Sequence, residues 1–494
     1  MSNDLETIRR IHAWHTGRPI ERGATLTCHV ASDDDAMVAA FLRMGGESRP
    51  WGVAIGTLRD GPRIFTVPEA RDRDAVADMM IEIAPVLLGH FRHPQWHDRG
   101  PGGFQTQSLR QLWLPGVTHL EMIQLVAAAY ARTRWERSDV VSLRALGNLC
   151  NAVFLEAQRP GQQIVVTATE ALRSAFVFPT SPIRQAHLGH LLAWLDSEGT
   201  RADREAEARE AERLSVSTVL DPEFERRELQ PLVSSWGAER TESSAKAIHG
   251  LLATELERRW NLTAATIARL RTDRRRPNSG LVKLVTSSAQ AFHLAWGERV
   301  MNEAAGLPPF WPNVFTDHNA RTAAGSYHAR VADHDEARAL LVHGDRELQR
   351  EELAAGKGVI AHVSSVVPDR WEITYSYPDL TTIEAGRTLT IAGRPTMRLD
   401  VVDVDLDARR MVLEPKWKRA KSAKSHEWAA SDSRWIATTL VLLVDVPVGV
   451  MRKKIKAARV QVDRDITSFL LSPPSRHAAY DDDGVVIESV EAER

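Results

Sequence analysis

A change of pattern after Gly356 constrains the fold of this chain more than any other feature of its sequence. Between residues 117 and 305, apolar residues recur at spacings of three and four, which is typical of helices that bury one face. After Gly356, short apolar runs recur at intervals of about 8–12 residues, a spacing typical of a small antiparallel barrel or sandwich. In Leu399–Asp405 the alternation places Val401 or Val402 inside and the aspartates outside. The sequence therefore predicts an α+β multidomain fold.

The first 116 residues indicate a mixed α/β module. We expect a strand at Ala24–Val30, a helix at Asp33–Met44, a hairpin of Trp51–Leu58 with Arg63–Val67, a helix at Asp74–Phe91 and a loop at His93–Gln107. The hairpin turn falls at Asp60-Gly61-Pro62, where Gly and Pro favour a turn.

Residues 117–305 indicate a mainly helical domain. The expected helices are His119–Arg134, Asp139–Gln158, Ser181–Leu195, Ala245–Trp260, Thr263–Arg271 and Gly280–Ala305, with a strand at Gln163–Thr169. Arg201–Leu214 has almost no apolar residues; we favour a solvated helix over a flexible linker, because Ala, Glu and Arg propagate helices well.

Three further segments complete the chain. We expect a linker and charged helix at 306–357, the helix being Asp335–Ala355, because the three prolines of Gly306–Asn319 mark a change of module. The small β-barrel at 358–472 would use the strands Gly358–Val366, Trp371–Ser376, Thr388–Ile391, Thr396–Asp405, Arg410–Leu413 and Trp435–Val446, followed by a basic, mostly helical segment at Val450–Leu471. The many acidic residues near the C-terminus predict an acidic, disordered tail at 473–494.

Composition excludes several classes of protein. Among 494 residues, 43% are hydrophobic and 26% are charged, an ordinary globular mixture that fits neither a disordered nor a collagen-like chain. Two cysteines, Cys28 and Cys150, are too few for a disulfide framework or a cysteine zinc site. We find no signal peptide and no apolar run of about 18 residues, so we expect a cytoplasmic protein without a membrane partner.

The distribution of charge is the strongest functional signal. The whole chain has a net charge of −2, yet the 51 residues from Arg409 to Arg459 carry thirteen cations and four carboxylates, a net charge of +9. The rest of the chain therefore carries −11. Segregation of this kind favours a polyanionic partner.

Tryptophan accompanies the cations, because Trp417, Trp428 and Trp435 lie in the same stretch. Lys and Arg bind phosphates, and aromatic rings can stack on unpaired bases, so we predict a nucleic-acid-binding segment. Its candidate residues are Lys416, Trp417, Lys418, Arg419, Lys421, Lys424, Arg452, Lys453, Lys454, Lys456 and Arg459. Two alternatives remain: an acidic protein partner, or a solvated loop whose tryptophans belong to the barrel core.

A second basic cluster ends a predicted helix before Pro277. It consists of Arg271, Arg274, Arg275 and Arg276, with Arg269 one turn earlier. Cations are favoured at helix C-termini by the helix dipole alone, so a structural role competes with a binding role.

Catalytic motifs are mostly absent: the sequence has no phosphate-binding P-loop, dinucleotide fingerprint, HExxH motif or GxSxG elbow. One candidate is Glu414-Pro415-Lys416 at a strand end, since metal-dependent nucleases place a carboxylate on Mg²⁺ and a Lys near the attacking water. Asp369 or Asp400 would supply the second acid. Against this hypothesis, Glu-x-Lys is common by chance and its neighbourhood is all short strands.

Histidines cluster in two regions that match no familiar ligand spacing. They are His93 and His97 beside Asp98, and His318, His328, His334 and His343 with nearby aspartates; we expect surface roles and no metal or other cofactor. His187 and His190, three apart on a helix, are expected to pack in the interior.

These observations favour a non-catalytic or weakly catalytic subunit. We expect it to bind DNA or RNA through the C-terminal barrel and its basic extension, within a multi-protein bacterial machine of genome maintenance or anti-phage defence. A protein partner, such as a motor or nuclease subunit, would supply the chemistry. The alternatives are a metal-dependent nuclease using Glu414 and Lys416, and a protein–protein scaffold with a basic docking segment.

Overall fold

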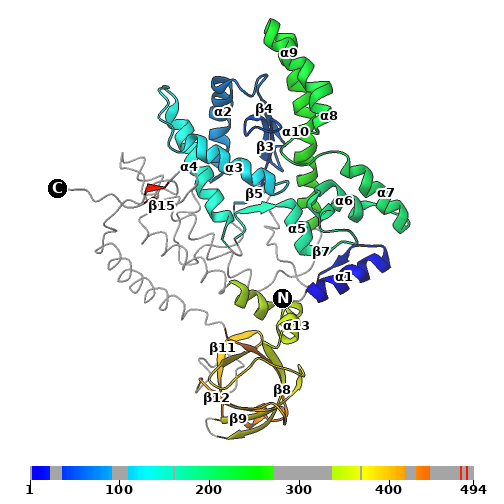
Figure 1. Ribbon diagram of the computed structural model, residues 1–494, viewed down its shortest axis with the longest axis vertical. Coiled ribbons are helices and arrows are strands. Elements are labelled where there is room, and N and C mark those ends of the chain that lie inside the picture. Colours follow the sequence, from blue (N-terminus) through cyan, green and yellow to red (C-terminus); the bar gives the residue numbers. More distant parts are fainter. Residues whose placement is uncertain are drawn as a thin grey trace, which may run out of the picture. The chain divides into compact units, whose positions relative to one another are not determined.

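The computed structural model of the 494-residue chain places two groups of secondary structure, a mixed sheet with helices and a β-barrel (Figure 1). It describes residues 3–22, 36–91, 110–159, 162–271, 337–367, 370–417, 430–445, 479–480 and 486–487. The fold is α+β, as the sequence predicts: an N-terminal mixed sheet with helices, a central helical region and a six-stranded antiparallel barrel.

The N-terminal sheet has five strands in the order β4-β3-β2-β5-β6. They are β2 (Met37–Arg43), β3 (Pro50–Thr57), β4 (Arg63–Thr66), β5 (Leu112–Leu114) and β6 (Val165–Thr167). The first three form an antiparallel meander, whereas β5 pairs in parallel with β2, and β6 in parallel with β5. The strand order therefore reverses between β2 and β5.

The predicted hairpin is confirmed by β3 and β4, but the predicted helix Asp33–Met44 is wrong. Met37–Arg43 is the strand β2, and its first six residues are buried. A short apolar run of this kind has neither a 3.6-residue nor a two-residue period, because both of its faces are covered, so periodicity alone cannot separate helix from strand.

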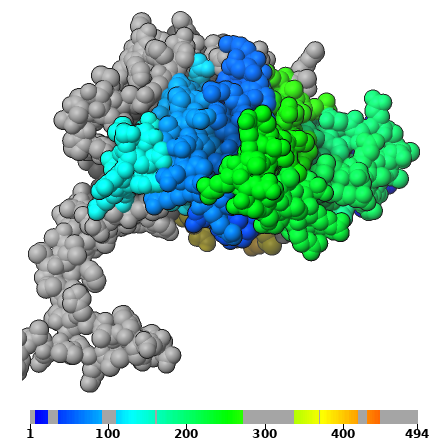
Figure 2. Space-filling view, turned by 90° about the horizontal axis from the view of Figure 1, so that it is seen from above, coloured from blue at the N-terminus to red at the C-terminus, as the bar shows by residue number. Residues whose placement is uncertain are grey.

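Helices cover both faces of the meander. One is α2 (Arg73–Phe91), which confirms the helix expected at Asp74–Phe91, and the other is α10 (Glu242–Arg271). Both contact β3 and β4, which lie between them (Figure 1). Figure 2 shows the blue segment that contains α2 beside the green segment that contains α10. Six consecutive residues of β3 are buried as a result.

α10 is one helix of 30 residues, although the sequence suggests two helices, Ala245–Trp260 and Thr263–Arg271. The hydroxyls of Thr263 and Thr266 donate hydrogen bonds to backbone carbonyls four residues earlier on the same helix, both at 3.0 Å. The polar stretch that suggests a break is therefore accommodated inside a continuous helix.

The other helices of this region are α1 (Asn3–Thr16), α3 (Val117–Tyr130), α4 (Val140–Ala157), α5 (Ala168–Ala175), α6 (Leu188–Asp196), α7 (Arg201–Glu212), α8 (Pro222–Phe224) and α9 (Gln230–Glu239). Of these, α3, α4, α6 and α7 correspond to expected helices with shifted ends, whereas the sequence did not predict α1, α5, α8 and α9. A 3₁₀ helix (Arg184–Ala186) precedes α6, a π-helix (Glu225–Leu229) links α8 to α9, and β1 (Ile20–Glu21) pairs with β7 (Phe176–Val177).

α7 confirms the helical interpretation of the polar stretch after Arg201. Thr200 accepts from the Asp203 backbone N–H, and the Asp203 carboxylate accepts from the Thr200 backbone N–H, so a capping box starts the helix. Only Ala208 is buried along α7, in agreement with a solvated helix.

The barrel is closed by six antiparallel strands in the order β10-β11-β12-β9-β8-β13. They are β8 (Gly358–Val367), β9 (Arg370–Tyr377), β10 (Thr388–Ile391), β11 (Arg394–Asp405), β12 (Arg410–Pro415) and β13 (Thr439–Val444). The predicted barrel is confirmed, except that Ser433–Trp435 forms a 3₁₀ turn before β13. Val401 is the inward residue and Val402 the exposed one.

A helical segment precedes the barrel where one charged helix is expected at Asp335–Ala355. Residues 337–344 are helical, and a second helix, α13 (Arg346–Ala354), follows. Asp345 interrupts them because its side chain accepts the Glu347 N–H at 2.7 Å and caps α13. His343 joins this segment to the barrel by accepting the Gly393 N–H at 3.2 Å.

Several sequence predictions lie outside the described residues: Ala24–Val30, His93–Gln107, Gly280–Ala305, Gly306–Asn319 and Val450–Leu471. Within the predicted tail, the described residues form one antiparallel pair, β14 (Ala479–Tyr480) with β15 (Val486–Ile487). This pair belongs to a compact unit separate from the one formed by Met1–Pro308 and Ala337–Asp445.

Among the described helices, α4 alone is long and apolar enough to span a membrane by length and composition. Half of it is buried inside the fold, where it packs against α2 and α3, as a core helix does.

Candidate functional sites

The basic segment is only partly within the described residues. Of the sequence-predicted binding residues, Lys416 and Trp417 are described; Lys418, Arg419, Lys421, Lys424, Arg452, Lys453, Lys454, Lys456 and Arg459 lie outside. In the second basic cluster, Arg271 ends α10, whereas Arg274, Arg275 and Arg276 lie outside.

The described cations of the segment from Arg409 to Arg459 are paired with carboxylates. Arg409 contacts Asp379 at 2.8 Å and Arg410 contacts Glu372 at 3.7 Å. Arg434 contacts Asp432 at 2.5 Å, in a pair close in sequence. These ion pairs are exposed and worth little in free energy, but they reduce the positive charge of the barrel wall itself.

Lys416 brings together three members of the nuclease hypothesis. Asp400 on β11 lies directly opposite Glu414 on β12 in the sheet register. The Lys416 ammonium contacts the Asp400 carboxylate at 3.0 Å and the Glu414 carboxylate at 3.1 Å. Asp369, the other acid considered, lies outside the described residues.

The electrostatics of this cluster favour ion pairs. Partial burial opposes ionisation of Asp400, but hydrogen bonds from Lys416 and Thr388 outweigh it and lower the pKa of the carboxyl. Hydrogen bonds to Asp400 and Glu414 raise the pKa of Lys416. The ammonium therefore stays between the two carboxylates over the neutral range, where a divalent cation would have to displace it.

Trp417 packs on the barrel core. Its ring meets Trp371 edge-on, with 5.5 Å between centroids, and Trp435 lies 5.1 Å from Trp371. The Trp371 indole donates to the Ala430 carbonyl at 2.8 Å. The chain on either side of residues 418–429 is therefore fixed at one tryptophan cluster (Trp371, Trp417 and Trp435), which favours an anchoring role for Trp417 over base stacking.

Histidine contacts fit structural roles where they are described. His190 is 1% exposed; it donates to the Ala208 carbonyl and accepts from the Trp194 indole, so its expected packing role is confirmed. His93, His97, Asp98, His318, His328 and His334 lie outside the described residues. Within the part of the chain that the structure describes, no group of three His, Cys, Asp or Glu could hold a metal ion.

The crevice between β2 and β5 lies at the carboxyl ends of parallel strands, the place where open α/β sheets commonly bind ligands. β5 pairs with only Met37 and Val38 of β2, so the two strands separate beyond that point. Here the chain itself fills the crevice, because residues 214–219 run beside the end of β2 and the Thr218 carbonyl accepts the Arg43 N–H at 2.7 Å.

His119 on α3 links β2 to this segment. Its Nδ1 accepts the Phe41 N–H at 3.0 Å, so Nε2 carries the proton and donates to the Val216 carbonyl at 3.0 Å. Burial, reinforced by the charge of Arg259, lowers the pKa of His119 to about 3. His119 is therefore a neutral bridge between two backbone groups.

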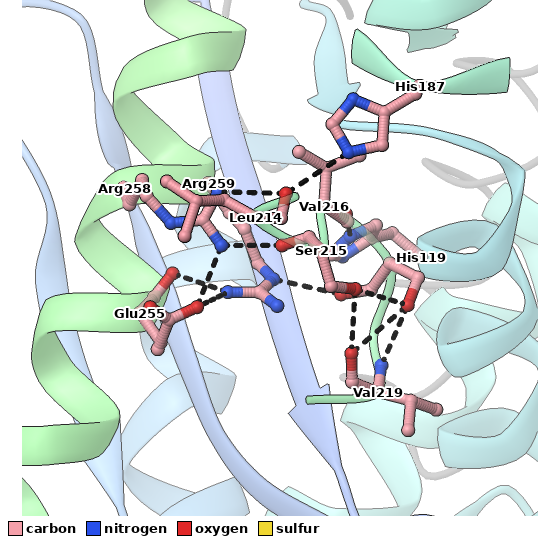
Figure 3. Close-up of polar contacts among 10 residues, drawn as sticks. His119, His187, Leu214, Ser215, Val216, Val219, Glu255, Arg258 and Arg259 are labelled. Carbon is pink, nitrogen blue, oxygen red and sulfur yellow. Dashed lines mark hydrogen bonds and ion pairs between the residues drawn. The ribbon is translucent and has the colours of Figure 1, made fainter. Parts of the chain in front are cut away.

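His187, directly before α6, and two arginines on α10 donate hydrogen bonds to the backbone carbonyls of Leu214, Ser215 and Ser217 (Figure 3). His187 donates to the Leu214 carbonyl at 3.1 Å, and Arg258 donates to the Ser215 carbonyl. Arg259, which is fully buried, donates to the Ser217 carbonyl at 2.8 Å and pairs with Glu255 at 2.6 Å. Burial, only partly offset by Glu255, lowers the pKa of Arg259 to about 10, so this guanidinium stays charged at neutral pH.

A cavity of about 350 Å³ lies next to this crevice, at the carboxyl ends of β5 and β6. It is bounded by the turn from β5 into α3 (Pro115–Thr118), the start of α5 (Thr169 and Glu170), Glu212, and residues 215–217. Ile183, Ala186 and His187 complete the lining. No pattern in the sequence marks this site, because its residues lie on segments far apart in the chain and match no motif.

Comparison with protein-family models, with curated proteins and with solved structures found no match to this chain.

Proposed function

We propose that the chain is a nucleic-acid-binding accessory subunit, and that a protein partner such as a motor or nuclease subunit supplies the chemistry. The observation that carries this proposal is the charge distribution: a net +9 between Arg409 and Arg459 in a chain whose remaining residues carry −11. A local excess of cations binds phosphates and releases their counterions, which supplies most of the affinity for nucleic acids.

The barrel supports the proposal by fixing the residues on both sides of a basic stretch, Trp417 and Ala430. Residues 418–429 contain four cations and one carboxylate, and the chain at both ends of the stretch is held at the tryptophan cluster. Since Arg409, Arg410, Lys416 and Arg434 are paired with carboxylates, the phosphate contacts are assigned to Lys418, Arg419, Lys421 and Lys424 and to the later cluster that begins at Arg452.

Fluorescence anisotropy with labelled oligonucleotides tests this function. The full chain is titrated against single-stranded DNA, double-stranded DNA and RNA at salt concentrations from about 50 to 200 mM. We expect binding whose log affinity falls linearly with log salt, with a slope of about −4 or steeper. Absence of binding, or an affinity independent of salt, would refute the proposal.

A second candidate function is metal-dependent nuclease activity, favoured by the meeting of Asp400, Glu414 and Lys416 on adjacent strands. The test is cleavage of the same oligonucleotides with and without Mg²⁺. This candidate requires Mg²⁺-dependent cleavage that Glu414→Gln abolishes, with Glu372→Gln on the neighbouring strand β9 as the matched control. Cleavage that persists in Glu414→Gln, or none at all, leaves the accessory role.

A further inference from the structure

The crevice between β2 and β5 is filled by the chain, but the cavity next to it, at the carboxyl ends of β5 and β6, is accessible. Residues 214–219 occupy the crevice between β2 and β5, whereas the adjacent space of about 350 Å³ is left empty by the described residues that line it. Pockets for small molecules in proteins measure roughly 300–1,000 Å³, so this one has room for one or two rings and not for a dinucleotide.

The rim of the cavity is apolar. Val117 and Ile183 both line it, and they are 61% and 86% exposed. The lining surface is also mainly apolar. Exposed aliphatic side chains in the lining favour a ligand with flat apolar faces, because the ligand covers them when it binds.

The lining has few polar groups, and they include both hydrogen-bond donors and acceptors. The Thr118 hydroxyl has no hydrogen-bond partner among the described residues. The hydroxyls of Ser215 and Ser217 already donate to the Val219 carbonyl, at 3.0 and 3.1 Å, so toward a ligand they can only accept. The Glu212 carboxylate can accept hydrogen bonds from a ligand, in addition to its ion pair with Arg184 at 3.4 Å. Such a set suits a ligand edge that both donates and accepts hydrogen bonds.

The charged side chains of the lining give an anionic ligand no partner. No Lys or Arg belongs to the described lining, whereas Glu170 and Glu212 do. Glu170 pairs with Arg173 at 2.7 Å and Glu212 with Arg184 at 3.4 Å, so a phosphate or carboxylate placed here would find no unpaired cation in the described lining. The ligand is therefore neutral.

We infer that this cavity binds a neutral heterocyclic base, carried either by a free nucleoside or by an unpaired nucleotide of a strand. Such a base has two apolar faces, an edge with donors and acceptors, and a size that fits the volume. The inference goes beyond the proposed function, since it rests on the N-terminal α/β region and makes no use of the basic segment.

Saturation-transfer NMR and calorimetric titration of the full chain test the inference. The probes are uridine, cytidine, adenosine and guanosine, each compared with its 5′-monophosphate. We expect saturable binding of at least one nucleoside and a monophosphate affinity about threefold or more weaker, because the phosphate would give up water without gaining an unpaired cation of the described lining. Failure of every nucleoside to saturate the signal in the millimolar range, or tighter binding of the monophosphates, would overturn the inference.

Two matched variants locate the binding. Ala186→Trp places a large side chain on an exposed residue of the lining, and Ala238→Trp places one on an exposed residue of α9. Nucleoside affinity should fall about tenfold or more in the first and stay unchanged in the second, with equal thermal unfolding of both; equal affinities would overturn the assignment. If Ala186→Trp also weakens oligonucleotide binding, the base comes from a strand; if it does not, the ligand is the free nucleoside.

Discussion

At the scale of single residues, His119 is the most informative side chain. It is buried, neutral and bonded through both ring nitrogens, to the Phe41 N–H and to the Val216 carbonyl. The sequence carries no signal for this role, because Phe41, His119 and Val216 come from three distant segments. The sequence shows a histidine near the start of a helix, and only the fold shows that it replaces a missing strand partner beside β2.

The buried state of His119 predicts a dependence of stability on pH. Its pKa falls from about 6.5 in the unfolded chain to about 3 in the fold, so the unfolded chain binds more protons between these values. The stabilisation from neutral His119 is complete above pH 6.5 and is lost as the pH falls toward 3. Between pH 6.5 and 4.5 we expect a loss of about 2–3 kcal/mol in the free energy of unfolding, measured by urea denaturation.

His119→Gln is the control for this prediction. The amide can accept from one backbone group and donate to the other without titrating in this range, so the pH profile of the variant should be flatter than that of the wild type. His187 and His190, whose pKa values burial also lowers, remain in both proteins and cancel in the comparison. Parallel profiles would show that His119 does not titrate with folding.

At the scale of elements, the barrel was predictable and β2 was not. Apolar and polar residues alternate along Leu399–Asp405, which indicates a strand with one buried face. Of Val401 and Val402, it is Val401 that lies inside the barrel. β2 is buried on both faces, so its sequence has no alternation to read. The same limit applies to the candidate sites: Glu414 and Lys416 could be named from sequence, whereas their pairing with Asp400 follows from the register of β11 against β12.

The tryptophan cluster gives the prediction at this scale. Trp371→Phe removes the N–H that donates to the Ala430 carbonyl and reduces the ring packed against Trp417 and Trp435. We expect the barrel to lose about 1–3 kcal/mol of stability. Trp236→Phe on α9 is the matched control and should change stability by less than about 0.5 kcal/mol, since Trp236 is only partly buried. Equal effects in thermal unfolding would show that the cluster does not hold the two ends of residues 418–429.

At the scale of the whole molecule, the account depends on charge that is gathered in one part of the sequence. The described part of that segment shows cations already paired with carboxylates, so folding neutralises some of the excess that the sequence displays. The sequence could report the excess but not the pairs of Arg409, Arg410 and Lys416 with Asp379, Glu372 and Asp400, because these three carboxylates precede the segment. What remains for a nucleic acid is concentrated in residues 418–429 and 452–459.

The most direct test of the account changes four charges in one place and the same four charges elsewhere. The variant Lys418→Ala, Arg419→Ala, Lys421→Ala, Lys424→Ala is compared with Arg209→Ala, Arg213→Ala, Arg227→Ala, Lys246→Ala. The side chains changed in this control are 61–77% exposed and lie on, or directly after, helices of the α/β region. The measurement is the slope of log affinity for an oligonucleotide against log salt. The account predicts that the first variant flattens the slope by about 3 and that the control leaves it unchanged. Equal slopes for the wild type and both variants would contradict it.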